Sequence, residues 1–251
     1  MKVEGLFLDY DGTIGPLKVS RQESTVSKET ATILHRIKQL IPVGIITTKD
    51  LSFIISRTPF ASAWCGIAGL EMKVGNKIFK DTRVESSLSK VLLAIKKTEE
   101  LTKDKLLIER KYDSKGRVLA FCVDWRAFPN LEKARVIARD IMFICRMLGL
   151  IVIEYKGQPF LDVYPCHIDK GKALTHLKRR LGIRNGVIYL GDSKVDNPAF
   201  RVANVGIGVL HKESLTGLDC DYHVKFEDVA KFLRHLLEEN LVFHKNFPEI
   251  T

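Results

Sequence analysis

The chain has 251 residues, of which 45% are hydrophobic and 28% charged, so it can bury a sizeable core as one large domain or two small ones. No run approaches the roughly 20 apolar residues of a membrane-spanning helix, and the N-terminus lacks a secretory pattern, so we expect a cytoplasmic protein that does not insert into membranes. The 5 cysteines are scattered, without a C-x-x-C pair, and predict reduced thiols rather than a disulfide framework.

The net charge of +10 raises the question of a nucleic-acid partner. The basic residues are spread over many expected helices, and 96–97 and 178–180 are typical of solvated helix faces. A mildly cationic surface also steers phosphorylated metabolites toward a protein. Charge alone therefore does not decide between an enzyme for such a metabolite and a basic nucleic-acid-binding module, although the spread argues against nucleic acid.

The first expected strand, residues 3–8, runs directly into Asp9, Asp11 and Gly12. In open α/β sheets, ligands bind in the crevice beyond the carboxyl ends of the strands. An acid fixed at a strand tip, such as Asp9, can attack an electrophile, and Asp11 on the turn can carry a proton. The alternative is a strand-end acid followed by an ordinary Asx turn.

A helix over 28–41 is expected next, capped by Ser27 and stopped by Pro42. A second buried strand, 43–47, ends in the polar residues Thr47, Thr48 and Lys49. A hydroxyl at a strand end donates well to a phosphate oxygen, although a β-branched residue often simply finishes a strand. Asp50 is expected to cap a helix through residue 57, and Gly75-Asn76 is a hairpin turn signal between two short strands.

The pattern changes near residue 82. Helical periodicity over 84–103 and 131–148 alternates with pairs of expected strands, at 105–111 and 117–125 and at 150–155 and 160–164. This α-β-β-α-β-β block can bury a small core of its own. We therefore expect two domains: residues 1–81 with 167–251, and an inserted domain, residues 82–166.

Asp169 is expected to cap the next helix, whose first turn holds Lys170 and Lys172. Cations are unfavourable at a helix N-terminus, so a compensating anion or a tolerated surface lysine is implied. The strand over 186–191 then ends in Asp192, and Asp196 follows four residues later. Further strands at 204–210 and 221–226 and a helix over 227–239 complete the alternation.

Three strands thus end in polar side chains that we expect to converge at one edge of the sheet. Carboxylates brought together in a crevice repel one another unless a cation neutralises them. Hard oxygen ligands favour Mg²⁺, which binds through one or two carboxylates plus a substrate phosphate. An ammonium group from Lys170 would balance the remaining charge.

These residues resemble the four motifs of the haloacid dehalogenase superfamily of phosphotransferases: Asp9-x-Asp11-Gly-Thr13, then Thr47, then Lys170, then Gly191-Asp192-x-x-x-Asp196. The resemblance covers essentially the whole chain. It implies an α/β fold, in which a Rossmann-like core with a mainly parallel sheet carries an inserted α+β cap of the C2 type.

The resemblance also implies roles for the matching residues. Asp9 would attack phosphorus to give an aspartyl-phosphate, and Asp11 would act as general acid and base. Thr47, Thr48 and Lys170 would bind the phosphoryl oxygens. The metal residues would be Asp9, Asp11 through its backbone carbonyl, and Asp192, with Asp196 supporting the site.

Within the superfamily the chain is most similar to trehalose-6-phosphate phosphatases. The likeness rests on four segments. Gly66-Ile67-Ala68-Gly69-Leu70-Glu71 resembles the family segment G-x-H-G-x-E, and Glu109-Arg110-Lys111 resembles E-x-K. Val123-Asp124-Trp125-Arg126 is similar to H-Y-R, and Asp162-Val163-Tyr164-Pro165 is similar to E-x-x-P. It implies a phosphorylated sugar as substrate and a monomer or small homo-oligomer, with these substrate-binding residues: Lys49, Glu71, Lys111, Arg126 and Asp162. The alternatives are that Lys111 and Arg126 are surface charges of the inserted domain, and that Glu71 and Asp162 pair with neighbouring lysines.

Several positions depart from that pattern: Lys49, Ala68, Asp124, Asp162 and Ser193 replace the Arg, His, His, Glu and Asp of the family. Some of these positions would touch the sugar. Sucrose-phosphate and mannosyl-3-phosphoglycerate phosphatases, and phosphatases for other small metabolites, therefore remain alternatives.

Overall fold

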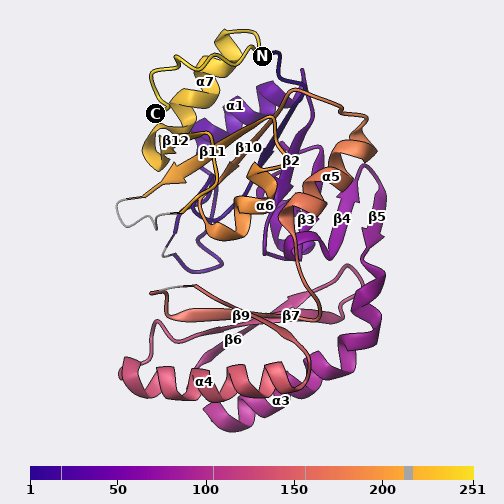
Figure 1. Cartoon of the computed structure of the whole chain (residues 1–251), viewed down its shortest axis with the longest axis vertical. Helices are drawn as coiled ribbons and strands as arrows, with labels where there is room; N and C mark the ends of the chain where they lie inside the picture. The colour runs from indigo at the N-terminus through magenta and orange to yellow at the C-terminus, as the bar shows by residue number, and fades with distance from the viewer. Residues whose placement is uncertain (18, 104, 156, 212–216) are drawn as a thin grey trace. The chain divides into compact units, whose positions relative to one another are not determined.

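The computed structural model describes residues 1–17, 19–103, 105–155, 157–211 and 217–251. The chain divides into two compact units, Met1–Phe79 with Asp169–Thr251, and Lys80–Ile168 (Figure 1). We call them the core unit and the inserted unit. That the inserted unit is a cap of the C2 type stays a prediction.

The central sheet of the described residues has the strand order β12-β11-β10-β1-β2-β3-β4-β5. In this order, the neighbours from β12 to β3 pair in parallel, and β4 pairs antiparallel with β3. This arrangement confirms the predicted α/β class with a mainly parallel sheet. The strands are β1 (Gly5–Leu8), β2 (Val43–Ile46), β3 (Ala63–Gly66), β4 (Glu71–Val74), β5 (Lys77–Lys80), β10 (Val187–Gly191), β11 (Val205–Leu210) and β12 (Tyr222–Lys225).

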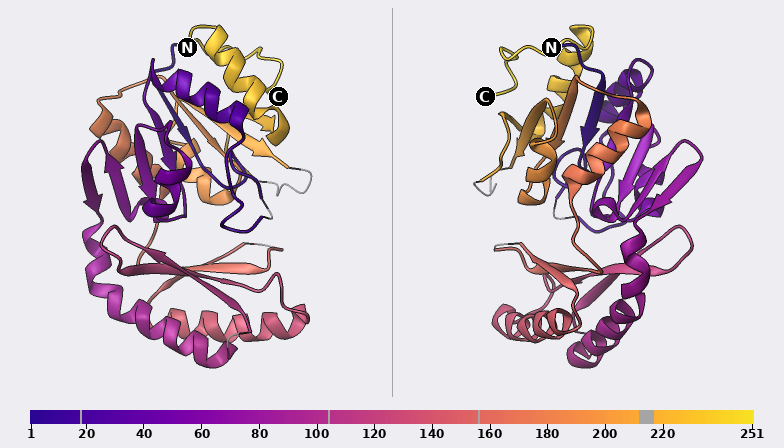
Figure 2. Two further views of the ribbon diagram at one scale, coloured as in Figure 1. Left: turned by 180° about the vertical axis from the view of Figure 1, so that it is seen from behind. Right: turned by 45° about the vertical axis from the view of Figure 1, so that its right-hand side comes forward.

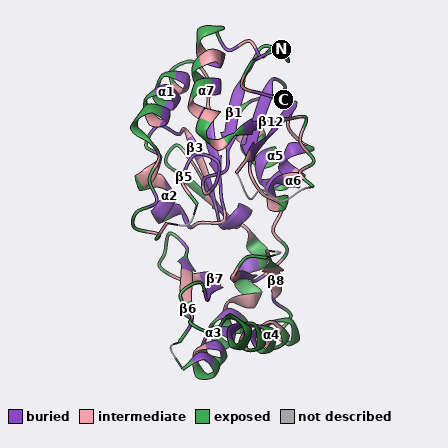
Figure 3. Ribbon diagram, turned by 90° about the vertical axis from the view of Figure 1, so that its left-hand side faces the viewer, coloured by how far each residue is buried: buried purple, intermediate pink, exposed green. Residues whose placement is uncertain are grey.

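Helices cover both faces of this sheet (Figure 2). Because side chains alternate along a strand, Leu6 and Leu8 of β1 face one helical layer and Phe7 faces the other. The first layer contains α1 (Lys28–Lys38), α2 (Leu51–Arg57) and α7 (Val229–Glu238), and the second contains α5 (Lys170–Leu181) and α6 (Asn197–Phe200). Figure 3 shows buried strands in the middle of the sheet and exposed outer faces on the helices. Among the described residues, no helix has the length and apolar character that crossing a membrane requires.

The helix starts follow the predicted caps. The side chains of Ser27 and Asp50 accept hydrogen bonds from backbone amides in the first turns of α1 and α2. Asp169 accepts from the amides of Gly171 and Lys172 at 2.8 and 3.0 Å, which starts α5 at Lys170. Each cap satisfies amides that have no partner inside the helix. The 3₁₀ turns of the core unit are η1 (Ile67–Gly69), η3 (Lys194–Asp196) and η4 (Phe226–Asp228).

The inserted unit has an antiparallel sheet of order β6-β7-β9-β8, and α3 and α4 share a core with Phe121 and Val123 of β7. The sequence predicts a helix from residue 84, whereas α3 begins at Leu88 after a 3₁₀ segment, η2. Ser86 and Ser87 end that segment, and serine competes with helical hydrogen bonding through its own hydroxyl. The elements are η2 (Thr82–Ser87), α3 (Leu88–Thr102), β6 (Leu107–Tyr112), β7 (Val118–Asp124), α4 (Leu131–Met147), β8 (Ile151–Glu154) and β9 (Phe160–Tyr164).

Candidate active site

Three adjacent parallel strands end in the polar residues that the sequence places at strand ends. Asp9 follows β1, Thr47 follows β2 and Asp192 follows β10, and β1 pairs with both of the other strands. The chain leaves β1 toward β2 on one side and returns to β10 on the other. Such a reversal of strand order opens a crevice at the carboxyl edge of a sheet, which is the usual place for a ligand.

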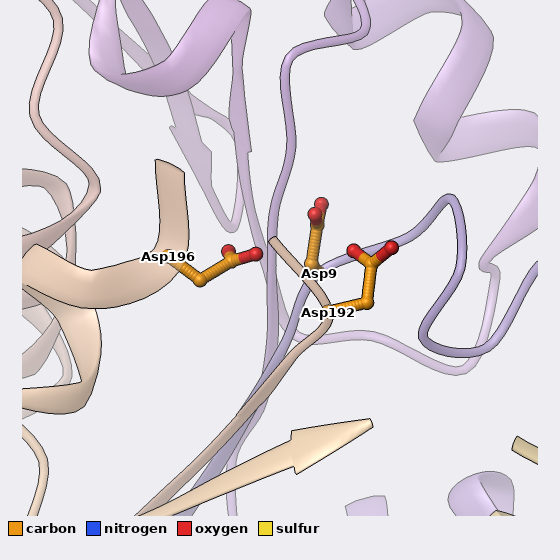
Figure 4. Close-up of side chains that lie close together, drawn as sticks. All are labelled: Asp9, Asp192 and Asp196. Atoms are coloured by element: carbon orange, nitrogen blue, oxygen red, sulfur yellow. The ribbon is translucent and has the colours of Figure 1, made fainter. Parts of the chain in front are cut away.

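A buried ammonium group joins two of the acids in this crevice. Lys170 Nζ lies 2.7 Å from Asp9 Oδ2 and 2.7 Å from Asp196 Oδ1, and its side chain has no exposed surface. Carboxylate oxygens of Asp9, Asp192 and Asp196 lie within 4.8 Å of one another (Figure 4). The structure therefore brings together Asp9, Lys170, Asp192 and Asp196 from opposite ends of the chain.

The charges in this cluster are unbalanced, because one ammonium faces three carboxylates. Burial raises the pKa of Asp9 to about 7, although Lys170 acts in the opposite direction. Burial and repulsion from Asp9 and Asp196 hold the pKa of Asp192 well above its ordinary value. Burial alone would lower the pKa of Lys170, but the carboxylates of Asp196 and Asp9 outweigh it and raise this pKa.

Asp196 differs from the other acids because each of its two oxygens accepts two hydrogen bonds from protein donors. Oδ1 accepts from Lys170 Nζ at 2.7 Å and from the Tyr189 hydroxyl at 2.5 Å. Oδ2 accepts from the amide and the hydroxyl of Ser193, both at 3.0 Å. Ser193, which replaces an acid of the family pattern, thus helps to hold Asp196 at the start of α6.

Asp11 lies beyond Asp9 on the loop after β1, and 31% of its side chain is exposed. Its Oδ2 is 3.6 Å from Nζ of Lys49, which the sequence predicts as a substrate-binding residue. The next residue, Gly12, has φ +73°, and a β-carbon there would lie 2.1 Å from Oδ2 of Asp192. Only glycine therefore fits where this loop crosses the carboxylate of Asp192.

The loop after β2 is braced by strained backbone. Ile67 and Ala68 have φ of 49° and 50°, a left-handed conformation that is rare for a β-branched residue. Their amides donate to the carbonyls of Lys49 at 2.7 Å and Thr47 at 2.8 Å. Backbone strain of this kind persists where the surroundings enforce it and is common at functional sites.

The other predicted site residues lie as follows. In the core unit, Thr48 is half-buried next to Thr47, and Glu71 is buried at the start of β4.

In the inserted unit, Lys111 Nζ donates to Asp162 Oδ1 at 2.6 Å, and Arg126 pairs with Asp124 at 2.5 Å. Asp162 Oδ2 also accepts from the hydroxyls of the two nearby tyrosines, Tyr155 at 2.8 Å and Tyr164 at 3.0 Å. Asp162 thus pairs with a neighbouring lysine.

Two residues that contact the site have no counterpart in the sequence predictions. Tyr189 is buried inside β10 and donates to Asp196, and a position inside a strand gives no sequence signal for this role. His211 follows β11, and its Nε2 lies 2.6 Å from the carbonyl oxygen of Gly12. His211 shares the strand-end position of Asp9 and Asp192, and the same reasoning could have selected it.

Curated relatives and solved structures resemble the chain over most of its length. A protein of Arabidopsis thaliana named probable trehalose-phosphate phosphatase D is 26% identical, over 93% of this chain and 67% of that protein. A crystal structure of a trehalose-6-phosphate phosphatase related protein has a TM-score of 0.77 at 20% identity, covering 94% of this chain and 98% of the other. The C-terminal domain of Candida albicans trehalose-6-phosphate phosphatase has a TM-score of 0.75 at 17% identity, covering 96% and 93%. At these identities the structural likeness establishes the fold.

A match to the haloacid dehalogenase-like hydrolase family extends over residues 95–225, more than half of the chain. The matched segment contains Lys170, Asp192 and Asp196, the residues that come together with Asp9 at the carboxyl edge of the sheet. The chain belongs to the haloacid dehalogenase-like hydrolases.

Proposed function

We propose that the protein is a Mg²⁺-dependent phosphatase that removes the phosphoryl group from a phosphorylated sugar. The observation that carries this proposal is the contact between Lys170 and both Asp9 and Asp196, beside Asp192, at the point where the strand order reverses. The relatives named trehalose-phosphate phosphatases support a disaccharide phosphate as the substrate class.

Asp9 is the proposed nucleophile. Its Oδ1 accepts from the amide of Tyr10 at 2.7 Å and its Oδ2 from Lys170, and these donors orient the carboxylate. A carboxylate oxygen attacks phosphorus, the bond from phosphorus to the sugar oxygen breaks, and the sugar oxygen takes a proton from Asp11. Asp11 then accepts a proton from water, which attacks the aspartyl-phosphate and releases inorganic phosphate and the carboxylate of Asp9.

Lys170 and the loop after β2 would bind the phosphoryl oxygens. Within the described residues, two of the three Lys170 N–H groups donate to Asp9 and Asp196, and the third would donate to an oxygen of the substrate. The hydroxyls of Thr47 and Thr48 lie at the end of the strand next to β1. Donors fixed in advance around the transferring group lower the barrier because they need not reorganise during the reaction.

The donor set fits a hard divalent cation. Asp9 is buried and Asp192 is partly buried, the two lie close together, and their mutual repulsion would be relieved by a bound Mg²⁺. We propose Asp9, Asp192 and the backbone carbonyl of Asp11 as its ligands, with Asp196 supporting the site through Lys170. When bound, the ion would supply positive charge that stabilises the transferring phosphoryl group.

The sugar would be bound by residues whose roles stay predictions: Lys49, Glu71, Lys111, Arg126 and Asp162. Lys111 and Asp162 already hydrogen-bond to each other, so they present a fixed, charge-assisted pair rather than two mobile side chains. We propose that sugar hydroxyls bind to the remaining donor and acceptor positions of this pair. The cytoplasmic location and the oligomeric state also stay predictions.

The proposal is tested by phosphate release from a panel that contains trehalose 6-phosphate, sucrose 6-phosphate, mannosyl-3-phosphoglycerate and p-nitrophenyl phosphate. We expect Mg²⁺-dependent release from a sugar phosphate and its complete loss in Asp9→Asn. Asp219→Asn, which changes an exposed acid of the core unit paired with Arg201, serves as the matched control and should retain activity. Retained activity in Asp9→Asn rejects the nucleophile, and hydrolysis only of non-sugar phosphates rejects the substrate class.

A further inference from the structure

A histidine from the far side of the site contacts the loop that carries Asp11. His211 follows β11, and its ring stacks on Phe226 with centroids 4.9 Å apart and an interplanar angle of 30°. Its Nε2 lies 2.6 Å from the carbonyl oxygen of Gly12. Since a carbonyl oxygen only accepts, Nε2 carries the proton and donates it. None of the steps proposed above uses this residue.

The strand order explains how residues 199 positions apart meet. β1, β10 and β11 are neighbours in the sheet, so the loop after β1 reaches β11 by crossing the end of β10. Gly12 makes this crossing directly against the carboxylate of Asp192. Asp192 and His211 therefore flank Gly12, and the ring of His211 is itself fixed by Phe226.

Among the described residues, the other backbone hydrogen bonds of residues 10–15 close within the loop. The amide of Gly12 donates to the carbonyl of Gly15 at 2.9 Å, and the amides of Ile14 and Gly15 donate to that of Tyr10 at 3.0 and 2.8 Å. These bonds keep the turn in shape but do not tie it to a neighbouring strand. The bond from His211 does, one residue beyond Asp11.

We propose that His211 is a positioning residue, whose Nε2–H holds the carbonyl of Gly12, one residue beyond Asp11, and thereby fixes the Asp11 carboxyl relative to Asp9. The kinetic part of this proposal rests on the proposed phosphatase function. A general acid must lie within hydrogen-bond reach of the atom it protonates, so a loosened loop lowers the chemical rate more than it weakens binding. Substrate binding by Lys170 and Thr47 does not depend on this loop.

Two amide substitutions separate the donated bond from the ring. His211→Gln places an N–H close to the position of Nε2, whereas the shorter side chain of His211→Asn does not reach the Gly12 carbonyl. We expect a kcat roughly ten- to a hundredfold lower in His211→Asn with KM changed by less than about twofold, because small displacements of reacting groups cost rates of this order. His211→Gln should remain within about threefold of wild type in kcat, since it keeps a neutral hydrogen bond of ordinary strength.

A second measurement is independent of turnover. Hydrogen exchange of the peptide covering residues 9–15 should be faster in His211→Asn than in wild type and unchanged in His211→Gln. His223→Asn is the matched control, because His223 lies on β12 and contacts Cys220 Sγ at 3.3 Å rather than the loop. It should change neither kcat nor the exchange of this peptide.

The outcomes distinguish this proposal from the proposed function. If wild type releases phosphate but His211→Asn equals it in kcat and in exchange, the role of His211 is rejected and the function stands. If His211→Gln is as impaired as His211→Asn, the donated hydrogen bond is not what matters, which also rejects the role. If wild type hydrolyses no phosphate ester, the function fails, and the exchange comparison alone decides whether His211 holds the loop.

Discussion

Replacement of one buried carboxylate should destabilise the core unit measurably. In Asp196→Asn, a side chain of the same size offers one acceptor oxygen and one NH₂ group instead of two acceptors. If the NH₂ replaces Oδ1, it meets the donors of Lys170 and Tyr189, and if it replaces Oδ2, it meets the amide of Ser193. Either orientation sets a donor against a buried donor, and Lys170 loses one of its two counter-charges.

The size of the effect follows from these contacts. Breaking a buried ion pair by removing one partner costs about 3–5 kcal/mol. Lys170 keeps Asp9 at 2.7 Å, so we expect the lower end, about 3 kcal/mol. For a chain of this size 1 kcal/mol shifts the unfolding midpoint by about 2–4 °C, which predicts a midpoint lower by about 6–12 °C.

The assay must follow the core unit alone, because two units need not unfold together. The chain has 2 tryptophans. Trp64 lies on β3 of the core unit and Trp125 lies in the inserted unit. In a Trp125→Phe background, thermal unfolding monitored by fluorescence reports on the core. Asp228→Asn is the matched control: it breaks the ion pair between Asp228 and the exposed Lys231, which are 2.7 Å apart, and should lower the midpoint far less than Asp196→Asn does.

A double-mutant cycle identifies the cause. Lys170→Met combined with Asp196→Asn removes both charges, so the double variant should be more stable than the two single effects predict when added. Additive effects would show that the two side chains do not interact, and an unchanged midpoint in Asp196→Asn would refute the reasoning from buried donors.

Three further predictions concern the proposed metal ligands, the buried hydroxyl of Tyr189 and an acid of the inserted unit. Mg²⁺ at a hundredfold excess over Kd should increase the free energy of unfolding of wild type by about 2.7 kcal/mol and so raise its unfolding midpoint, and should not raise that of Asp192→Asn; equal shifts would remove Asp192 from the ligands. Tyr189→Phe should lower core stability by about 1.5 kcal/mol, less than Asp196→Asn does, because one hydrogen bond to a charged group is lost; a larger loss would contradict the ranking. Asp113 is buried, but hydrogen bonds from Lys80 and Arg117 outweigh that burial and lower its pKa from 3.8 to about 2. It should therefore stabilise the inserted unit above pH 4 and lose this contribution as the pH falls toward 2, and acid titration of Asp113→Asn should lack that loss.

The strand-end residues of the site were predictable because each follows a continuous apolar run. Parallel strands buried on both faces give such runs, and their carboxyl ends meet at one edge, so Asp9, Thr47 and Asp192 could be grouped from the residue pattern alone. Helix starts with an Asp or Ser cap, such as Asp169, were equally readable. For Lys170 at a helix start, the sequence left open a compensating anion or a tolerated surface lysine, and the structure places two carboxylates beside its ammonium group.

Other features left no local signal in the sequence. The left-handed backbone at Ile67 and Ala68 contradicts the preference of both residue types, and hydrogen bonds from their amides to the loop after β2 accompany it. The contact between His211 and Gly12 depends on strand order, which spacing along the chain does not reveal. Lys111 and Asp162 could each be assigned to substrate from the sequence, because nothing in it shows that β6 and β9 place them 2.6 Å apart.

The number of protein donors that each carboxylate accepts separates the acids of the site by role. Asp196 accepts four hydrogen bonds and is thereby held in place, as expected for a group that orients another side chain. Asp9 accepts two, which leaves lone pairs for a cation and for phosphorus. In the described part of the chain Asp192 accepts none, although it is packed against Gly12 and two other acids. A partly buried carboxylate without donors costs free energy unless a cation or a proton compensates it, so Asp192 is the residue whose environment most favours an ion from solution.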